Sequence, residues 1–148
     1  MKAFRGAWWW YGLFGRIIGY GYLWWPPLLL SLLVIAFSAV LFKVGDLRGM
    51  ITPTNEGAYY ASGPPVIRQN YPKFNSLTYS LETFLPLVKL QMADYWAPNA
   101  NLGTKIIEFK FGILRLGGLL RFWLWIHTIL GWVLTSLWVG RLTGLIKT

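Results

Sequence analysis

The chain contains no cysteine and only one histidine. Without cysteine it can form no disulfide, no thiolate metal site and no cysteine nucleophile. One histidine does not make a convincing metal-ligand cluster or Ser-His-Asp set. Acidic residues are also few, with five Asp and Glu among 148 residues, and they are scattered along the sequence. We therefore expect no catalytic set and no metal site, and a protein that is not an enzyme.

Charge of either sign is scarce. Charged residues make up 13% of the chain, whereas 55% is hydrophobic and 18% aromatic. Soluble domains carry roughly a quarter charged residues, so this composition indicates a membrane protein. The net charge is nevertheless +9. Because the basic residues flank apolar runs, we expect them to contact anionic lipid headgroups rather than nucleic acid.

Two uncharged apolar runs are long enough to cross a bilayer. They cover residues 26–42 and 122–140, close to the twenty residues that a hydrocarbon core of about 30 Å requires. The segment before the first run is rich in Trp, Tyr and basic residues, as expected for a helix lying along the membrane surface. The segment after it is rich in Gly, Pro, Asn and Ser, which indicates an extramembrane loop.

Between the two runs lies a segment that is too short to cross a bilayer and too apolar for an ordinary loop. It reads FNSLTYSLETFLPLVKLQMADYWAP and covers residues 74–98. Asn75 or Ser76 is suited to cap a helix, and Pro86 should kink or end that helix. We predict a helix that either re-enters the bilayer or lies at its surface.

Residues 104–121 fit two structures. Ile107 and Ile113 alternate with polar residues, as in a strand, but the nearby membrane span favours an amphipathic interfacial helix. We predict the helix, and hence an all-α membrane fold. Its predicted order is an interfacial segment (1–25), first transmembrane helix (26–42), loop (43–73), pore-helix-like segment (74–98), loop and interfacial helix (99–121), second transmembrane helix (122–140) and tail (141–148).

Two spans place both termini on one side of the membrane. The predicted interfacial segment and tail together carry five basic residues and no acidic residue. This favours cytoplasmic termini, because positively charged flanks stay inside and a long loop translocates largely regardless of its charge.

His127 is the one ionisable side chain in the middle of the second run. It can donate a hydrogen bond between helices, titrate in a pore, or bind haem or chlorophyll. Apart from this possible haem or chlorophyll, we expect no cofactor. Gly140 and Gly144 form a small-xxx-small pair, which permits close helix packing. Two transmembrane helices bury little surface against each other. Together with the two glycines, this favours a homo-oligomer or a place in a larger membrane complex.

Four segments carry a resemblance to a known family. They are GYGYLWWPPLLL, FNSLTYSLETFLPLVKL, YWAPN and ILGWVLTSLWVGRLTGLI. From about Gly19 to Ile146 the chain resembles a bacterial membrane module found behind pentapeptide-repeat regions. Such proteins are commonly labelled membrane-associated oxidoreductases, although no residue here supports that chemistry. The resemblance implies the bacterial inner membrane.

The module is in turn similar to two-span pore domains of the potassium-channel type. The stretch YSLETF at residues 79–84 matches their pore helix, which implies that Glu82 and Thr83 lie near the mouth of a pore. Pro86 and Lys89 stand where a glycine-rich filter would follow, and a lysine there repels cations. The leading hypothesis is a channel-like oligomer with a degenerate filter that is not selective for potassium, in which Lys89 sets the charge preference and His127 senses pH. The alternatives are an accessory subunit of a larger membrane complex and a pigment- or haem-binding subunit.

Overall fold

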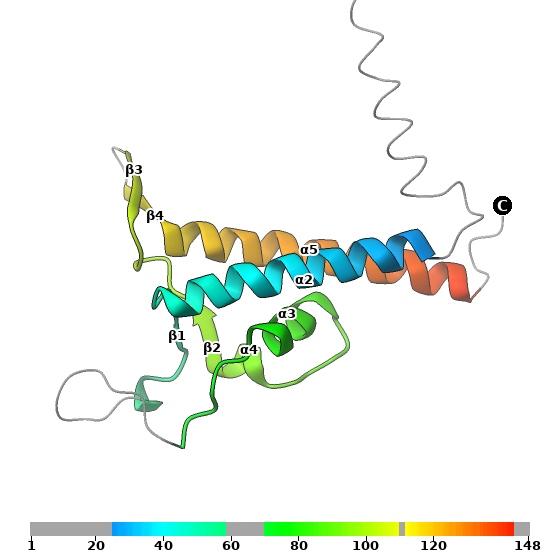
Figure 1. The fold of residues 1–148 in the computed structure, drawn as a ribbon, viewed down its shortest axis with the longest axis horizontal. Coiled ribbons are helices and arrows are strands. Elements are labelled where there is room, and N and C mark those ends of the chain that lie inside the picture. Colours follow the sequence, from blue (N-terminus) through cyan, green and yellow to red (C-terminus); the bar gives the residue numbers. More distant parts are fainter. Residues whose placement is uncertain (1–24, 59–69, 110–111, 144–148) are drawn as a thin grey trace, which may run out of the picture.

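Two long antiparallel helices form the frame of the molecule (Figure 1). The computed structural model describes residues 25–58, 70–109 and 112–143. Helix α2 spans Trp25–Leu47 and helix α5 spans Leu116–Leu142. At 1.5 Å per residue they are about 35 and 40 Å long, more than the roughly 30 Å of a hydrocarbon core. Both are long and apolar enough to cross a membrane. The predicted interfacial segment lies, up to residue 24, outside the described residues.

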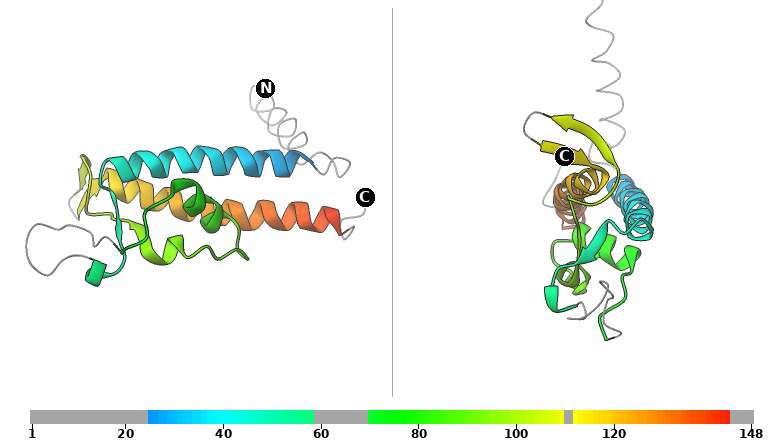
Figure 2. Two further views of the ribbon diagram at one scale, coloured as in Figure 1. Left: turned by 60° about the horizontal axis from the view of Figure 1, so that its bottom comes forward. Right: turned by 90° about the vertical axis from the view of Figure 1, so that its left-hand side faces the viewer.

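The two helices expose most of their apolar surface. Within the chain, only 28% of the most apolar 18-residue window of α2 and 17% of that of α5 are buried. A core helix of a soluble protein is buried all round, because its apolar side chains avoid water. These helices therefore need lipid or another protein around them. The N-terminal end of α2 and the C-terminal end of α5 lie at the same end of the pair (Figure 2).

Helix α2 continues five residues beyond the predicted end of the first span. Lys43 and Asp46 lie within it and form an exposed ion pair of 3.2 Å. The helix ends where Gly49 adopts a φ of 65°. The amide of Gly49 donates to the carbonyl of Asp46, and that of Met50 to the carbonyl of Gly45. This is the Schellman arrangement, which glycine favours because it has no Cβ. The apolar run thus ends at the charged Lys43, whereas the helix itself continues until Gly49 terminates it.

Four short strands correct the prediction of an all-α fold. Strand β1 (Ile51–Pro53) pairs antiparallel with β2 (Trp96–Pro98). This pair joins the loop after α2 to the end of the pore-helix-like segment. A single-turn 3₁₀ helix, η2 (Glu56–Ala58), follows β1. Helices still make up most of the described chain, so the prediction is right for the frame and wrong for these connections.

The predicted interfacial helix within 99–121 is also wrong. Strand β3 (Lys105–Phe109) pairs antiparallel with β4 (Gly112–Arg115), and α5 begins immediately afterwards. The alternation of apolar and polar residues has the period of a strand, and a hairpin pairs the backbone groups of its two strands locally. The alternation was therefore the correct signal for this segment, and its proximity to the second membrane span was not.

Helices α3 (Ser76–Phe84) and α4 (Met92–Tyr95) pack on one side of the long pair (Figure 1). The side chain of Asn75 accepts hydrogen bonds from the amides of Leu77 and Thr78 at 3.0 and 3.1 Å, and so caps α3. The helix ends at Phe84, two residues before Pro86. Buried side chains join α3 to the frame in two clusters. They are Phe42, Tyr79 and Leu120 with Met50, Ile51 and Trp96 in one, and Ile35, Phe84 and Leu134 in the other.

Candidate functional site

A buried polar cluster lies where α2, α3 and α5 meet. Each helix contributes one member, Ser38, Ser80 and His127 respectively, and all three side chains are 0% exposed. Nδ1 of His127 lies 2.8 Å from Oγ of Ser38. Its Nε2 lies 3.0 Å from the carbonyl oxygen of Ser80 and 3.4 Å from that residue's Oγ. The imidazole thus connects the two other helices to α5.

The hydrogen bonds of the cluster assign one tautomer to His127. A carbonyl oxygen only accepts, so Nε2 carries the proton and donates it to Ser80. Nδ1 then accepts from the Ser38 hydroxyl, whose oxygen accepts from Nε1–H of Trp123 at 3.0 Å. The Ser80 hydroxyl donates to the carbonyl of Ile35 at 2.9 Å. Every polar group of the cluster has a partner while the imidazole is neutral.

Aromatic rings close the cluster on two sides. The imidazole centroid lies 5.9 Å from that of Phe42 and 5.2 Å from that of Phe84. Both ring nitrogens contact serine groups, so a haem or chlorophyll ligand role would require one of these hydrogen bonds to break. The interhelical hydrogen bond is the alternative for which the contacts are present. The pore and pigment alternatives stay predictions.

A glycine allows α3 to approach α5 closely. A Cβ at Gly131 would overlap the backbone of Phe84 at the end of α3, with its carbonyl carbon 2.7 Å away. Gly131 lies four residues after His127 and Trp123 four residues before it, so one stripe of α5 carries the contacts to both neighbouring helices. Sequence reasoning missed Ser38, Ser80, Trp123 and Gly131. The four-residue spacing around the lone histidine was the available signal.

The predicted pore residues have separate environments. Oε2 of Glu82 accepts hydrogen bonds from the amides of Met92 and Ala93 at 2.7 and 2.9 Å. Oγ1 of Thr83 donates to the carbonyl of Tyr79 at 2.7 Å, within its own helix. Pro86 lies in the turn after α3, and Lys89 is exposed beyond it. Glu82 is therefore engaged in fixing α4 to α3.

The two glycines of the predicted packing pair are not both described. Gly140 lies in the last turn of α5, whereas Gly144 lies outside the described residues. Their role in helix packing stays a prediction. Among residues 25–58, 70–109 and 112–143, no three His, Asp or Glu side chains come together as metal ligands would.

Glu82→Ala should release α4 from α3. The change removes both hydrogen bonds to the amides of Met92 and Ala93, and bonds to a charged group contribute about 1.5–3 kcal/mol each where they are buried. Because Glu82 is partly exposed, we expect a local loss of about 2 kcal/mol. Hydrogen exchange of a peptide covering residues 86–96 should then accelerate about thirtyfold.

Glu82→Gln is the matched control for that exchange experiment, because its amide oxygen still accepts. It should accelerate exchange much less than Glu82→Ala. A peptide from the middle of α5 should exchange at the same rate in all three proteins. Equal exchange of residues 86–96 in the alanine variant and the parent chain would contradict the assignment.

No family model, no curated protein and no solved structure matches this chain.

Proposed function

We propose that the chain is a channel-like membrane protein that assembles as a homo-oligomer, with residues 85–91 of each copy facing a central water-filled path. The proposal rests chiefly on the position of Lys89. It follows in three steps from the depth of α3, the exposure of the segment after it, and the chemistry of a lysine at that depth.

The depth of α3 is the first step. Ser80 hydrogen-bonds the carbonyl of Ile35, near the midpoint of α2. Phe84 at the end of α3 contacts Gly131, near the midpoint of α5. If α2 and α5 cross a bilayer, α3 therefore enters from the side of the strands and ends about halfway through. This supports the re-entrant alternative over a helix lying at the surface.

The segment after α3 is the second step. Leu87 is 90% exposed, and Val88, Lys89 and Leu90 are exposed beside it. The chain then returns to the level of Glu82, whose carboxylate holds the first amides of α4. Residues 85–91 thus make a short excursion around the deepest point of α3. Leu85 packs against the cluster around Phe84, whereas residues 86–91 are all exposed.

The charge of Lys89 is the third step. A lysine near the middle of a bilayer is costly against lipid, so such residues face the interior of a bundle or a water-filled cavity. Copies of the chain arranged around an axis would give Lys89 that environment. A ring of lysines excludes cations and favours anions. The segment also contains no glycine, which argues against a potassium filter of close-packed carbonyls.

Planar-bilayer recording of the purified protein under a KCl gradient tests the proposal. The reversal potential should lie toward that of chloride. Lys89→Gln should reduce this preference and Lys89→Glu should reverse it, because the sign of the ring changes. Lys105→Glu is the matched control: Lys105 is exposed on β3, away from the proposed path, and its change should leave the reversal potential in place. A protein without conductance at any polarity or pH would contradict the proposal.

An accessory subunit of a larger membrane complex is the second candidate. It is supported by an exposed stripe on α5 made of Trp125, Ile129 and Trp132, which are 57, 64 and 59% exposed. Aromatic residues of this kind are enriched in protein interfaces. The stoichiometry of the complex purified in mild detergent separates the two. Several copies in a symmetric ring support the pore, whereas one copy bound to unlike chains supports the subunit.

The other predicted properties have direct tests. A Soret or chlorophyll band in the absorption spectrum of the purified protein would support the pigment alternative at His127. Localisation in a bacterial inner membrane rests on the family resemblance. The common end of α2 and α5 supports termini on one side of the membrane, and the basic tails support the cytoplasmic side. Because the native chain has no cysteine, single cysteines added at either terminus and labelled from one side would test that orientation.

A further inference from the structure

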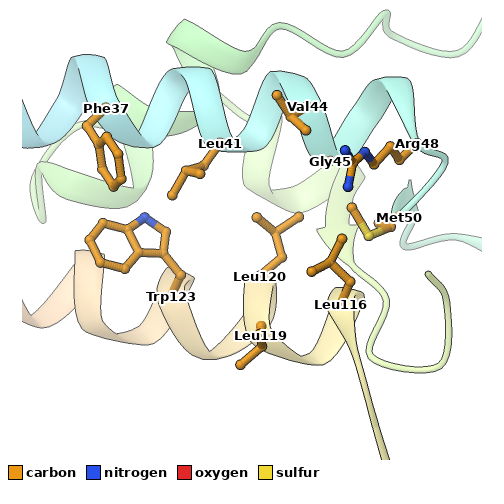
Figure 3. A pocket seen from close by; sticks show the side chains of 10 residues that line it. All are labelled: Phe37, Leu41, Val44, Gly45, Arg48, Met50, Leu116, Leu119, Leu120 and Trp123. Atoms are coloured by element: carbon orange, nitrogen blue, oxygen red, sulfur yellow. The ribbon is translucent and has the colours of Figure 1, made fainter. Parts of the chain in front are cut away.

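An apolar groove runs between α2 and α5 at the end that carries the strands. It has a volume of about 370 Å³, within the 300–1,000 Å³ of small-ligand sites. Leu41 of α2 faces Leu120 of α5 across it, and Arg48 lies at its outer end (Figure 3). At its inner end, Phe37 packs edge-to-face against Trp123, with ring centroids 5.4 Å apart. Several of the lining side chains are partly exposed, including Val44 at 39% and Leu119 at 41%, so the groove opens to the surroundings.

The groove lies on a different face of α2 from the helix α3. Residues 35 and 38 of α2 contact α3 and His127, whereas residues 37, 41 and 44 line the groove. Neighbouring helical positions are about 100° apart around the axis, so the two faces adjoin, and Trp123, which lines the groove, also donates to Ser38. Residues 85–91 do not line the groove. The groove is therefore open whether or not residues 85–91 face a pore, and the inference does not depend on the proposed function.

The length of the groove matches half a bilayer. Phe37 lies within α2 and Arg48 directly follows its last residue. The eleven positions between them correspond to about 17 Å along the helix axis. One leaflet of a hydrocarbon core is about 15 Å thick. The apolar part thus reaches from the level of the headgroups to the middle of the membrane, along the direction in which a lipid chain lies.

The outer end of the groove has the charge that a phosphate requires. Arg48 is exposed and forms no ion pair with another described residue. The neighbouring acid, Asp46, is engaged with Lys43 at 3.2 Å. Basic residues also outnumber acidic ones in the segments at this end, 43–48, 105–109 and 112–121. A guanidinium binds phosphate through paired hydrogen bonds.

We infer that this groove is a binding site for an anionic phospholipid, with one acyl chain between α2 and α5 and the phosphate at Arg48. The hydrophobic effect does not favour a groove over the bilayer, because both are apolar. Affinity must come from close packing along the groove and from the charge at its end. A second copy of the chain fits less well, since a stable protein interface covers about 800 Å² on each partner, far more than this narrow groove offers.

Native mass spectrometry of the detergent-solubilised chain tests the site. Phosphatidylglycerol and phosphatidylcholine with identical acyl chains are titrated separately, and we expect one phosphatidylglycerol retained per chain in preference to phosphatidylcholine. Arg48→Gln should weaken retention of phosphatidylglycerol about fivefold, the effect of one basic residue near a membrane surface. It should leave phosphatidylcholine unchanged. Lys105→Gln, at the same end but outside the groove, is its control.

Filling the groove separates packing from charge. Val44→Trp should weaken retention of both lipids about tenfold, because the indole occupies the space of the acyl chain. Leu32→Trp places the same side chain on an exposed face of α2 outside the groove and should bind as the parent does. Leu119→Trp fills the groove from α5 if the first variant does not fold. Equal retention by the groove and control variants, or no preference for phosphatidylglycerol, would overturn the inference. So would a groove variant that changes only the number of copies in the complex.

Discussion

Gly131→Ala should displace α3 from the two long helices. The added Cβ overlaps the backbone of Phe84, which cannot rotate away as a flexible side chain can. Overpacking costs about 1–3 kcal/mol, and more where backbone must shift. Replacing a helical glycine by alanine returns about 1 kcal/mol of helix propensity. The overlap is the larger effect, and we expect a net loss of about 2 kcal/mol in the free energy of unfolding.

Gly118→Ala is the matched control in the same helix. A Cβ there meets its nearest neighbour, Cδ1 of Leu114, at an ordinary 3.6 Å, so this variant should be as stable as the parent or slightly more stable. Thermal unfolding in detergent, followed by circular dichroism, compares the two. A cysteine introduced at Leu81, which packs in the cluster around Phe84, should also be labelled faster in the Gly131 variant alone. Equal labelling in both variants would show that α3 does not depend on this contact.

His127→Ala should also destabilise the junction of the three helices. It removes the hydrogen bonds to Ser38 and Ser80 and leaves a cavity beside Phe42 and Phe84. Hydrogen bonds between membrane helices contribute about 0.6–1.7 kcal/mol each. Together with the cavity we expect a loss of about 3 kcal/mol in the free energy of unfolding.

His127→Phe separates packing from hydrogen bonding at this position. Phenylalanine fills most of the space but cannot bond either serine, although the Ser38 hydroxyl can turn to a carbonyl of its own helix. This variant should lose about half as much stability as His127→Ala. If it unfolds at the same temperature as the parent chain, the hydrogen bonds contribute no net stability, and a chemical role for the histidine becomes the better explanation of its place.

The long helices could be predicted because each is determined by a local apolar run. The first span begins with prolines at 26 and 27 and continues through uncharged residues, a pattern that needs no knowledge of the rest of the chain. The same is true of α3, whose start at Asn75 and end before Pro86 are local signals. The end of α2 was harder, because charged residues stop an apolar run several residues before glycine stops the helix.

The remaining features depend on distant parts of the sequence. Strands β1 and β2 have three residues each and are over forty positions apart, so neither has a recognisable period of its own. Ser38 and Ser80 are ordinary small residues until the fold brings them to His127. The histidine was noticed as an intramembrane polar residue, but its partners lie 89 and 47 positions away. The candidate site is thus a property of the packing between helices, which a single sequence does not display.

The shared hydrogen bonds of His127 also imply an order of assembly. The pocket for α3 has one wall from α2 and another from α5, which is synthesised after both α2 and α3. Helices in membranes insert first and associate afterwards, so α3 has no complete binding surface until the second long helix is in place. We expect a nascent chain that ends before residue 116 to keep α3 accessible from outside the membrane. The entry of α3 would then be the final event in the assembly of these three helices. A protease added during synthesis should cleave α3 until α5 has been inserted, and not afterwards.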